Sequence, residues 1–428
     1  MKQFTAIVIG AGSRGSTYTN KMAEMPEKFK VIGVAEPIDD RRNYIKDKHN
    51  IADEHCFDTW EKILDIPKFA DVAIIATMDR MHTEPAIKAM ELGYDLLLEK
   101  PAAPTPEECA LIMKKAEEYG RKVLVCHVLR YTSFFKSLKK ILDDGVIGEV
   151  INVEHIEAVG YKHQSHSFVR GNWGNEERSS FMLLQKCCHD LDILQWLLDK
   201  KCERIQSFGS CRHFREENAP EGSPDYCIEG CPVGETCYYN AMKLYYDDKN
   251  NGWFRGAATG KTVPKDCDVL KALRETQYGK CVYKCDNDVV DHQTVNMEFE
   301  GGLTVVMTMS AFTRGGRRLR IMGTKGELVA NMSMPSDQAF CLFSFDTNET
   351  THINADYANV GDSITGGHGG GDQGIIADLY RYLTGELDAE DVSEIGISCQ
   401  NHMLAFAAED SRRNGTVVSL KEYMEKYM

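Results

Sequence analysis

The sequence has little proline, few tryptophans and no excess of basic charge. Its 428 residues include 12 Pro and 4 Trp, and 65 acidic against 50 basic side chains give a formal net charge of −15. A general nucleic-acid-binding protein normally carries a basic surface, so this balance argues against nucleic acid as a partner. No apolar run approaches the length of a membrane span, and we therefore expect no membrane partner either.

The chain also opens without the pattern of a secretory signal. Its first residues, MKQFTAIVIG, lack a charged stretch followed by a long apolar segment and a cleavage site. The 15 cysteines are spread over the whole chain, unlike those of a small disulfide scaffold. Together these features predict a cytoplasmic protein whose thiols are reduced.

What is present is the composition of a globular protein that is too long for one ordinary core. Hydrophobic residues make up 43% and charged residues 27% of the chain, and the length favours two domains. In residues 1–128, apolar strand-like segments alternate with helical stretches that include 84–92 and 106–119. This alternation predicts an α/β domain with a doubly wound parallel sheet. Its expected strands are 5–9, 30–35, 70–76, 94–98 and 122–127.

The pattern changes in residues 129–428, where strand-like runs dominate. They predict an α+β domain with a large, mostly antiparallel open sheet, in which two runs flanking Gly301 and Gly302 form a hairpin. An irregular, Cys-rich insertion is expected around 211–285, and helical stretches near the C-terminus are candidates for packing back onto the first domain. The expected strands are 150–158, 204–211, 293–299, 303–310 and 318–322, and the expected helices are 134–144, 181–198, 373–383 and 395–414.

A glycine-rich motif follows the first expected strand. The segment GAGSRG at 10–15 is G-x-G-x-x-G placed between a strand and a helix. Gly10 would make the tight turn, Gly12 would let the backbone approach a pyrophosphate, and Gly15 would permit close packing of the helix on the strand. The helix N-terminus adds free N–H groups and a positive dipole for the phosphates. A plain glycine turn is the alternative, but the context favours a Rossmann dinucleotide-binding domain over residues 1–128. The predicted cofactor contacts in the motif are Gly10, Gly12, Ser13, Arg14 and Gly15.

Glu36 stands at the end of the second expected strand. A carboxylate there can accept hydrogen bonds from both ribose hydroxyls of an adenosine, and it would repel the extra phosphate of NADP. NAD is therefore the favoured cofactor and NADP the less favoured one. Arg41 and Arg42 follow closely and could offset this preference. An ordinary surface charge is the alternative role for Glu36.

The end of the first domain resembles a known family of oxidoreductases. The segment IAT at 75–77, then His82 and Ala86, and then LEKP at 98–101 resemble the Gfo/Idh/MocA (glucose–fructose oxidoreductase / inositol dehydrogenase) family. The resemblance implies that the prolyl bond bends the chain into the active site, and that Lys100 reaches the reacting hydroxyl and the nicotinamide as a catalytic residue. Without the flanking matches, Glu-Lys-Pro would be only a polar strand end before a proline. The further cofactor contacts that the resemblance implies are Thr77, His82, Glu99 and Lys100.

The helix expected at 181–198 carries the second match. Its segment LQKCCHDLD places His189 and Asp192 where the family has a histidine and an aspartate. Positions three and four apart share a helix face, so these two side chains can point the same way as Gln185 and Lys186. The resemblance makes His189 the catalytic base for a hydroxyl proton, and a structural histidine is the alternative. Gln185 stands where the family often has a carboxylate, and Lys186 adds a second cation, which leaves open a substrate carboxylate or a different subfamily chemistry.

A polar loop at 163–173 joins the first strand of the second domain to this helix. Its His, Ser, Arg and Trp side chains suit a sugar, because polar groups bind hydroxyls and a flat ring packs on C–H groups. A surface loop is the alternative. Polar turns at 287–293 and 368–372 could line the same cleft or serve only as turns. The substrate-binding candidates are Arg130, His166, Arg170, Trp173, Lys186 and Asp192.

The cysteines of the insertion offer a metal site as an alternative to free thiols. Four of them could supply thiolates to zinc, with two more in reserve, but the spacings are C-x3-C and C-x5-C rather than paired C-x-x-C motifs. We expect free buried thiols and no metal. The four are Cys211, Cys227, Cys231 and Cys237, and the reserve is Cys281 and Cys285.

Taken together, these features predict an NAD-dependent oxidoreductase. It would transfer a hydride between the nicotinamide and a hydroxyl-bearing carbon of a sugar, an inositol or a related polyol. One alternative is a glycoside-cleaving hydrolase or lyase that oxidises its substrate transiently, and another is a non-catalytic NAD-binding regulator. The resemblance also predicts a homodimer or homotetramer formed through the open sheet.

Overall fold

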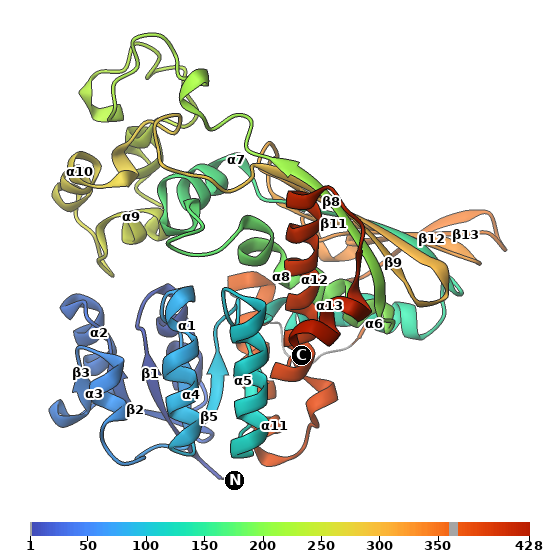
Figure 1. Ribbon diagram of the computed structural model, residues 1–428, viewed down its shortest axis with the longest axis horizontal. Helices are drawn as coiled ribbons and strands as arrows, with labels where there is room; N and C mark the ends of the chain where they lie inside the picture. Colours follow the sequence, from blue (N-terminus) through green and yellow to red (C-terminus); the bar gives the residue numbers. More distant parts are fainter. Residues whose placement is uncertain (1, 359–366) are drawn as a thin grey trace.

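The computed structural model describes residues 2–358 and 367–428 and divides them between two sheets (Figure 1). The first sheet has six parallel strands in the order β3-β2-β1-β4-β5-β6, which confirms the doubly wound prediction. Its central strands are buried on both faces, and this explains their unbroken apolar runs. The strands are β1 (Phe4–Ile9), β2 (Phe29–Ala35), β3 (Cys56–Phe57), β4 (Val72–Ile75), β5 (Asp95–Leu98) and β6 (Val123–Val125).

Helices cover both faces of the first sheet. One group packs with Ile7 and Ile9 of β1, and the other packs with Ala6 and Val8 of the same strand. The sequence pattern does not mark α2, because Ile45 is its only buried residue and no apolar stripe forms. The first group contains α3 (Trp60–Leu64), α4 (Thr83–Glu91) and α5 (Pro106–Tyr119), and the second contains α1 (Ser13–Ala23), α2 (Asp39–His49) and α11 (Gly371–Thr384).

The second sheet has nine strands in the order β14-β13-β12-β11-β7-β10-β9-β8-β15. All its pairings are antiparallel except that of β7 with β10, which confirms a mostly antiparallel open sheet. The predicted hairpin joins β9 to β10, with Gly301 and Gly302 at φ of 80°. The strands are β7 (Val150–Ala158), β8 (Cys202–Ser210), β9 (His292–Phe299), β10 (Leu303–Ser310), β11 (Gly316–Gly323), β12 (Gly326–Asn331), β13 (Phe340–Ser344), β14 (Glu349–Ile353) and β15 (Val418–Ser419).

The C-terminal helices connect the two domains. Of these, α12 (Ile395–Asn414) contacts both α5 of the first domain and α8 (Met182–Leu198) of the second, and α13 (Leu420–Tyr427) follows it. In α11, the ring of Tyr380 lies 5.8 Å from that of Phe4 and 5.9 Å from that of Phe29. Two further α-helices are α6 (Ser133–Asp143) and the short α7 (Tyr161–His163), which follows β7. Within the described residues, no helix combines the length and apolar character needed to cross a membrane.

The Cys-rich insertion forms a separate lobe above the first domain (Figure 1). It is less irregular than its composition indicates, because it contains α9 (Gly252–Thr259), α10 (Asp266–Glu275) and a π-helical turn (Met242–Asp247). The side chain of Asn251 caps α9 by accepting a hydrogen bond from Phe254 N at 3.2 Å. Phe254 then packs in a small apolar cluster with Val269 and Leu273 of α10. A few apolar side chains are thus enough to order two helices among many Gly, Pro and Asp residues.

Candidate active site

The glycine loop after β1 has the geometry that a bound dinucleotide needs. Gly10 has a φ of 87°, and a Cβ on it would lie 2.5 Å from the carbonyl oxygen of Ala76. A Cβ on Gly15 would lie 2.0 Å from the carbonyl oxygen of Gly10, so the helix packs directly on the turn. At Gly12 the nearest atom to such a Cβ is Nη1 of Arg41, at 3.7 Å. The loop is therefore tight on the protein side and open at Gly12, which fits the approach of a pyrophosphate.

Glu36 lies buried against this loop. Its carboxylate accepts a hydrogen bond from Ala11 N at 2.7 Å and another from Ile38 N at 3.0 Å. The two neighbouring arginines have different partners: Arg42 pairs with Asp39, whereas Arg41 donates from Nε to the carbonyl of Gly260 at 3.2 Å. Glu36 is thus held at the end of β2, where a ribose would lie, and Arg41 extends toward the insertion.

Arg14 connects the start of α1 to the end of β5. Its guanidinium pairs with Glu99 at 2.8 Å and with Asp372 at 2.6 Å. Burial alone would raise the pKa of Glu99, but the charges of Arg14 and Lys100 outweigh it and hold that pKa below its usual value. Glu99 in turn accepts a hydrogen bond from Lys100 N at 2.7 Å. The ion pairs of Arg14 therefore fix the backbone that carries Lys100.

His82 supports the same segment from the other side. It is buried, with Nδ1 2.8 Å from the carbonyl oxygen of Pro101 and Nε2 3.2 Å from that of Thr77. Thr77 also donates from Oγ1 to the carbonyl of Met81 at 3.0 Å. The predicted cofactor residues Thr77 and His82 thus hold the end of β4 next to the cis Lys100–Pro101 peptide.

Lys100 meets the helix that carries His189. Its Nζ donates to the carbonyl oxygen of Gln185 at 3.0 Å and lies 5.9 Å from the ring centre of Trp173. His189 is one helical turn further along α8, 8% exposed, with its ring 5.6 Å from that of His127. Lys100 of the first domain therefore contacts the helical turn that leads to His189 in the second, and the indole of Trp173 lies beside the lysine.

Lys186 and Glu157 form part of a charged network on the sheet side of α8. Nζ of Lys186 is 3.3 Å from Oε1 of Glu157, whose other oxygen is 2.9 Å from Nε of Arg317. The same Nε lies 2.8 Å from Asp190. Sequence reasoning missed Glu157 and Arg317, because their partners come from other elements and no local spacing indicates the pairing.

Arg130 and Asp192 lie close together, but they are bonded mainly to each other. Nε and Nη2 of Arg130 donate to the two oxygens of Asp192 at 2.6 and 2.7 Å, and both side chains are buried. Asn401 of α12 donates to the same carboxylate at 2.5 Å. Burial would raise the pKa of Asp192, but the charge of Arg130 lowers it below its usual value. This buried pair ties the region after β6 to α8 and α12.

The loop at 163–173 delivers only part of its polar side chains to Lys100. His166 is buried in the insertion, where Nδ1 lies 2.9 Å from the hydroxyl of Tyr245 and burial lowers the pKa of His166 to about 3. Arg170 is also buried there and donates to backbone carbonyls. Trp173 lies beside Lys100, and half-buried His163 has its pKa lowered by burial and by nearby Lys186. His163 belongs to the expected loop, although it was not among the selected candidates.

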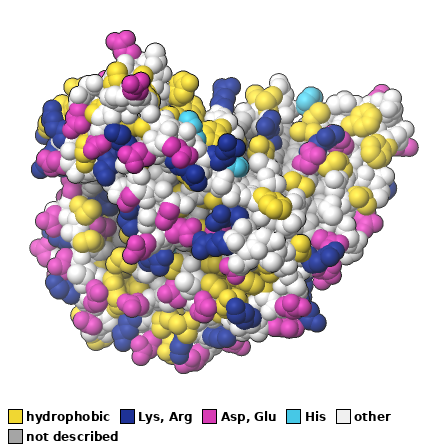
Figure 2. All heavy atoms as spheres, turned by 45° about the horizontal axis from the view of Figure 1, so that its top comes forward, with side chains coloured by type: hydrophobic (Ala, Val, Ile, Leu, Met, Phe, Trp, Pro, Cys, Tyr) yellow, Lys and Arg dark blue, Asp and Glu magenta, His cyan; other side chains and the backbone are white. Residues whose placement is uncertain are grey.

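The insertion reaches the cofactor side of the first domain. Besides the contact of Arg41 with Gly260, Thr262 N donates to Oδ2 of Asp40 at 2.9 Å. Figure 1 shows α9 and α10 above α2, and Figure 2 shows acidic and basic side chains intermingled over the surface of the insertion lobe. The insertion therefore joins the second domain to the helix that follows Glu36.

Two family models match most of the chain. The oxidoreductase family with an NAD-binding Rossmann fold matches residues 4–127, and the C-terminal alpha/beta domain of the same family matches residues 139–357.

Similar proteins of known name share less than 30% of their residues with this chain over the matched regions. The putative oxidoreductase YteT of Bacillus subtilis (strain 168) is 23% identical over 343 residues, which are 76% of this chain and 74% of that protein. The 2,7-anhydro-N-acetylneuraminate hydratase of Mediterraneibacter gnavus is 27% identical over 209 residues, 49% of this chain and 53% of that one. Inositol 2-dehydrogenase of Salmonella typhimurium is 23% identical over 202 residues, 47% and 56% of the two chains. The match thus spans about half the length of these last two proteins.

Solved structures share the fold over nearly the whole chain. Levoglucosan dehydrogenase in complex with NADH and levoglucosan has a TM-score of 0.70 at 16% identity, covering 98% of this chain and 100% of that one. An inositol dehydrogenase homolog with NAD+ from Azotobacter vinelandii has a TM-score of 0.69 at 16% identity, covering 98% and 97%. With both domain models matched in order, the chain belongs to the Gfo/Idh/MocA family of NAD-binding oxidoreductases.

Proposed function

We propose that the protein transfers a hydride between NAD and a hydroxyl-bearing carbon of a sugar, an inositol or a related polyol. The observation that carries the proposal is the contact of Lys100 Nζ with the Gln185 carbonyl at 3.0 Å, one turn before His189. This contact supports the proposal, because it joins the lysine of the first domain to the helical turn that leads to His189. Two of the similar proteins are named for inositol and for levoglucosan, which supports a polyhydroxylated substrate.

In this proposal His189, Lys100 and Trp173 have different roles toward the oxygen atoms of the substrate. NAD, when bound, accepts the hydride from the carbon. His189 takes the proton from the hydroxyl oxygen. Lys100 has three ammonium donors, one of which goes to Gln185, so the others can bind the oxygen and stabilise its negative charge. The buried Nε1 of Trp173 has no hydrogen-bond partner within the described residues and can donate to a second substrate oxygen.

NAD rather than NADP fits the end of β2. The carboxylate of Glu36 already accepts two backbone hydrogen bonds, yet two oxygens offer further lone pairs to the ribose hydroxyls. A phosphate at the same place would meet this buried negative charge. Of the two arginines that could favour the phosphate, Arg42 is paired with Asp39, and Arg41 donates from Nε to the carbonyl of Gly260.

A second candidate reaction keeps the cofactor in place. In cleavage or hydration by transient oxidation, the hydride returns to the product and no NADH accumulates. The hydratase relative and the contact of the insertion with α2 at Asp40 favour this alternative, because a retained cofactor needs no open route for exchange. Lys100 and His189 would keep the same roles.

The oligomeric state and the location belong to the proposal too. We expect the enzyme to act in the cytoplasm as a homodimer or homotetramer. Its open sheet carries exposed apolar side chains, with Ile151 on β7 51% exposed and Phe208 on β8 57% exposed, and a partner chain can cover them.

A panel of sugars, inositols and glycosides with NAD tests the function, with NADH and product followed in parallel. The proposal expects NADH to form in step with an oxidised product. Product without NADH would identify the second candidate reaction. No reaction across the panel, together with normal NAD binding, would contradict both and favour a non-catalytic regulator. His352→Ala, a change of an exposed histidine on β14, is the matched control for variants of His189.

A further inference from the structure

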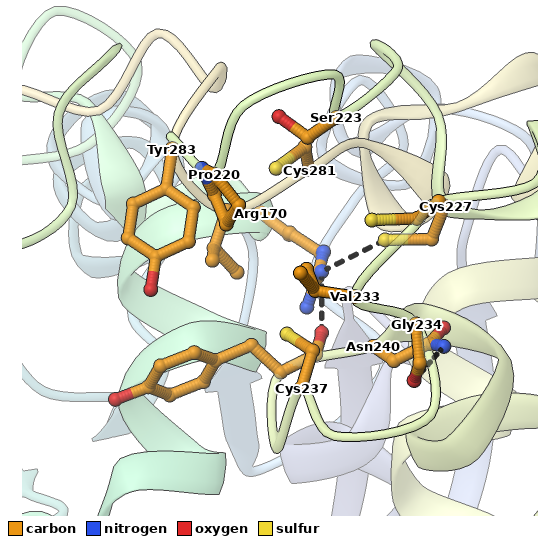
Figure 3. A pocket seen from close by; sticks show the side chains of 13 residues that line it. Arg170, Pro220, Ser223, Cys227, Val233, Gly234, Cys237, Asn240, Cys281 and Tyr283 are labelled. Carbon is orange, nitrogen blue, oxygen red and sulfur yellow. Dashed lines mark hydrogen bonds between the residues drawn. The ribbon is translucent and has the colours of Figure 1, made fainter. Parts of the chain in front are cut away.

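A cavity inside the insertion is lined by four cysteine side chains, Cys227, Cys231, Cys237 and Cys281 (Figure 3). The cavity is small, with a volume of about 20 Å³. None of these cysteines forms a disulfide. Burial raises the pKa of Cys237 and of Cys281, and the neighbouring thiols of Cys227 and Cys231 add to the rise in both cases. All four thiols therefore face one hollow from two separate segments of the chain.

Arg170 lies at the same cavity without an anionic partner there. Its side chain is buried, and it donates from Nε to the carbonyl of Lys280 at 2.8 Å and from Nη2 to that of Tyr239 at 2.7 Å. Nη2 is also 3.8 Å from Sγ of Cys227. Within the part of the chain that the structure describes, Nη1 has no hydrogen-bond partner, and no Asp or Glu is among the residues that line the cavity. A buried guanidinium in this setting favours an occupant that carries negative charge.

The all-sulfur donor set limits the chemistry of that occupant. Thiolates bind zinc or iron–sulfur clusters in preference to hard cations. Zinc needs all four thiolates at about 2.3 Å from one ion. Among the described residues, no group of three or more His, Cys, Asp or Glu side chains is placed to hold a single metal ion. A polynuclear core binds each cysteine at a different iron, so it does not need all four thiols around one ion.

We propose that Cys227, Cys231, Cys237 and Cys281 bind a cubane-type four-iron iron–sulfur cluster. Four cysteine thiolates are the usual ligands of such a cluster, and their negative charge would balance Arg170. The sequence favoured free thiols and no metal, and the set differs from the zinc alternative that it offered, because Cys281 takes the place of Cys211. Cys211 does not line the cavity, and its Sγ lies 3.7 Å from the carbonyl of Phe214.

The cluster would act as a structural link in a lobe with little core. Two small apolar clusters pack in the insertion, and one of them is shared with Val169 and Ala311 outside it. Cys281 N already donates to the carbonyl of Asp225 at 2.8 Å, two residues before Cys227. Binding Cys281 together with the segment 227–237 would join the two ends of the insertion. It would also fix Arg170 and thereby the loop that brings Trp173 to Lys100. No electron transfer is required for this role, and it stands independently of the proposed reaction.

The direct test is the composition of the full-length protein produced without oxygen and with iron and sulfide in supply. We expect about four iron and four acid-labile sulfide per chain, with a broad visible absorption that dithionite partly bleaches. Absence of iron and sulfide in protein that binds NAD would overturn the proposal. Zinc at one per chain without sulfide would overturn it as well.

Two single variants test the ligand assignment. Cys281→Ser should lose most of the iron, whereas Cys267→Ser, a change of an exposed cysteine on α10, should keep it. Equal iron content in the two variants would contradict the assignment. Because Cys281→Ser can also loosen the insertion, NAD binding is measured on the same samples as a check that the first domain is folded. Loss of iron with NAD binding retained is the result that we expect.

Discussion

The first domain and the Cys-rich insertion differ in how their polar sites are built. In the first domain, backbone groups of the glycine loop and the ends of β1, β2 and β5 are set by a large core of fully buried strands. The insertion has two small apolar clusters and gathers side chains from distant positions around Arg170. A short motif can therefore indicate the first kind of site, whereas the second kind becomes visible only in the folded chain.

The insertion contacts the first domain at α2, and we expect this contact to affect cofactor binding rather than the chemistry at Lys100. The insertion bonds to Asp40 and Arg41, which follow Glu36, the residue that we propose binds the ribose. Changes at Lys100 should therefore affect the chemistry, and changes at α2 should affect how the cofactor is held.

The largest effect is expected from Lys100→Met. This change removes the ammonium that would stabilise the substrate oxygen, so turnover should fall by about 10²–10⁴-fold, at least as much as for His189→Ala. Steady-state kinetics on the identified substrate measure it. Lys162→Met, a change of an exposed lysine, is the control. Turnover within a few-fold of the wild type would remove Lys100 from the chemistry.

His189→Ala should lower turnover by about 10²–10⁴-fold, the usual contribution of a general base. NAD affinity should hardly change, because we propose that the glycine loop and Glu36 make the phosphate and ribose contacts. Calorimetry for NAD, next to turnover, separates the two effects. If turnover stays near normal, the histidine is structural, and the base must be sought at Lys100 or Lys186.

Asp192→Asn should destabilise the fold by about 3–5 kcal/mol at neutral pH, because it leaves the guanidinium of Arg130 buried without its carboxylate. The pKa of Asp192 is lower in the folded state than in the unfolded state. Its contribution to the free energy of unfolding is therefore fully present above the unfolded pKa of about 3.9, and it is lost as pH falls through the folded pKa. The gap in urea midpoint between wild type and variant should therefore narrow on acidification. Asp143→Asn, at an exposed surface pair, should change little, and an equal loss there would contradict the account.

NAD should bind more tightly than NADP by about 2 kcal/mol or more, roughly a factor of 30 in the dissociation constant. The reason is the buried carboxylate of Glu36 at the place of the extra phosphate. Titrations with both cofactors measure the two dissociation constants. In Arg41→Ala, NAD should still bind more tightly than NADP by about the same factor. Equal or tighter binding of NADP would mean that Arg41 dominates.

The smallest effect is expected at the contact between the two regions. Asp40→Ala removes the acceptor of one exposed hydrogen bond from Thr262 N, so NAD should dissociate about two- to fivefold faster. Stopped-flow displacement of NAD measures the rate, with Asp47→Ala on the same helix as the control. Identical rates in both variants would show that the insertion does not restrain the cofactor.

The sequence indicated the sites that rest on local motifs and missed those that rest on distant pairing. The glycine loop and Glu36 were predicted from a strand, a turn and a helix in series, and the structure places them together. By contrast, nothing near Arg130 in the sequence indicates that its guanidinium is bonded to Asp192, because the partner lies on a helix formed much later in the chain. His166 was expected in the cleft but packs against Phe254, since the aromatic residues of the insertion cover it.

Secondary structure shows the same division. The apolar runs of the parallel strands and the hairpin at Gly301 and Gly302 were visible. The short strands β13 and β14 were not, because they end the sheet and β14 is mostly exposed, so no clear alternation of polar and apolar residues marks it.

The most direct test of the central claim is deuterium transfer to the cofactor. Substrate labelled with deuterium at the reacting carbon is mixed with enzyme and NAD for a single turnover, and the cofactor is analysed by mass spectrometry after rapid quenching. The account predicts NADH that carries the label in the wild type, and almost none in Lys100→Met or His189→Ala. A substrate that is converted by the wild type while the cofactor never acquires deuterium would contradict hydride transfer at this site.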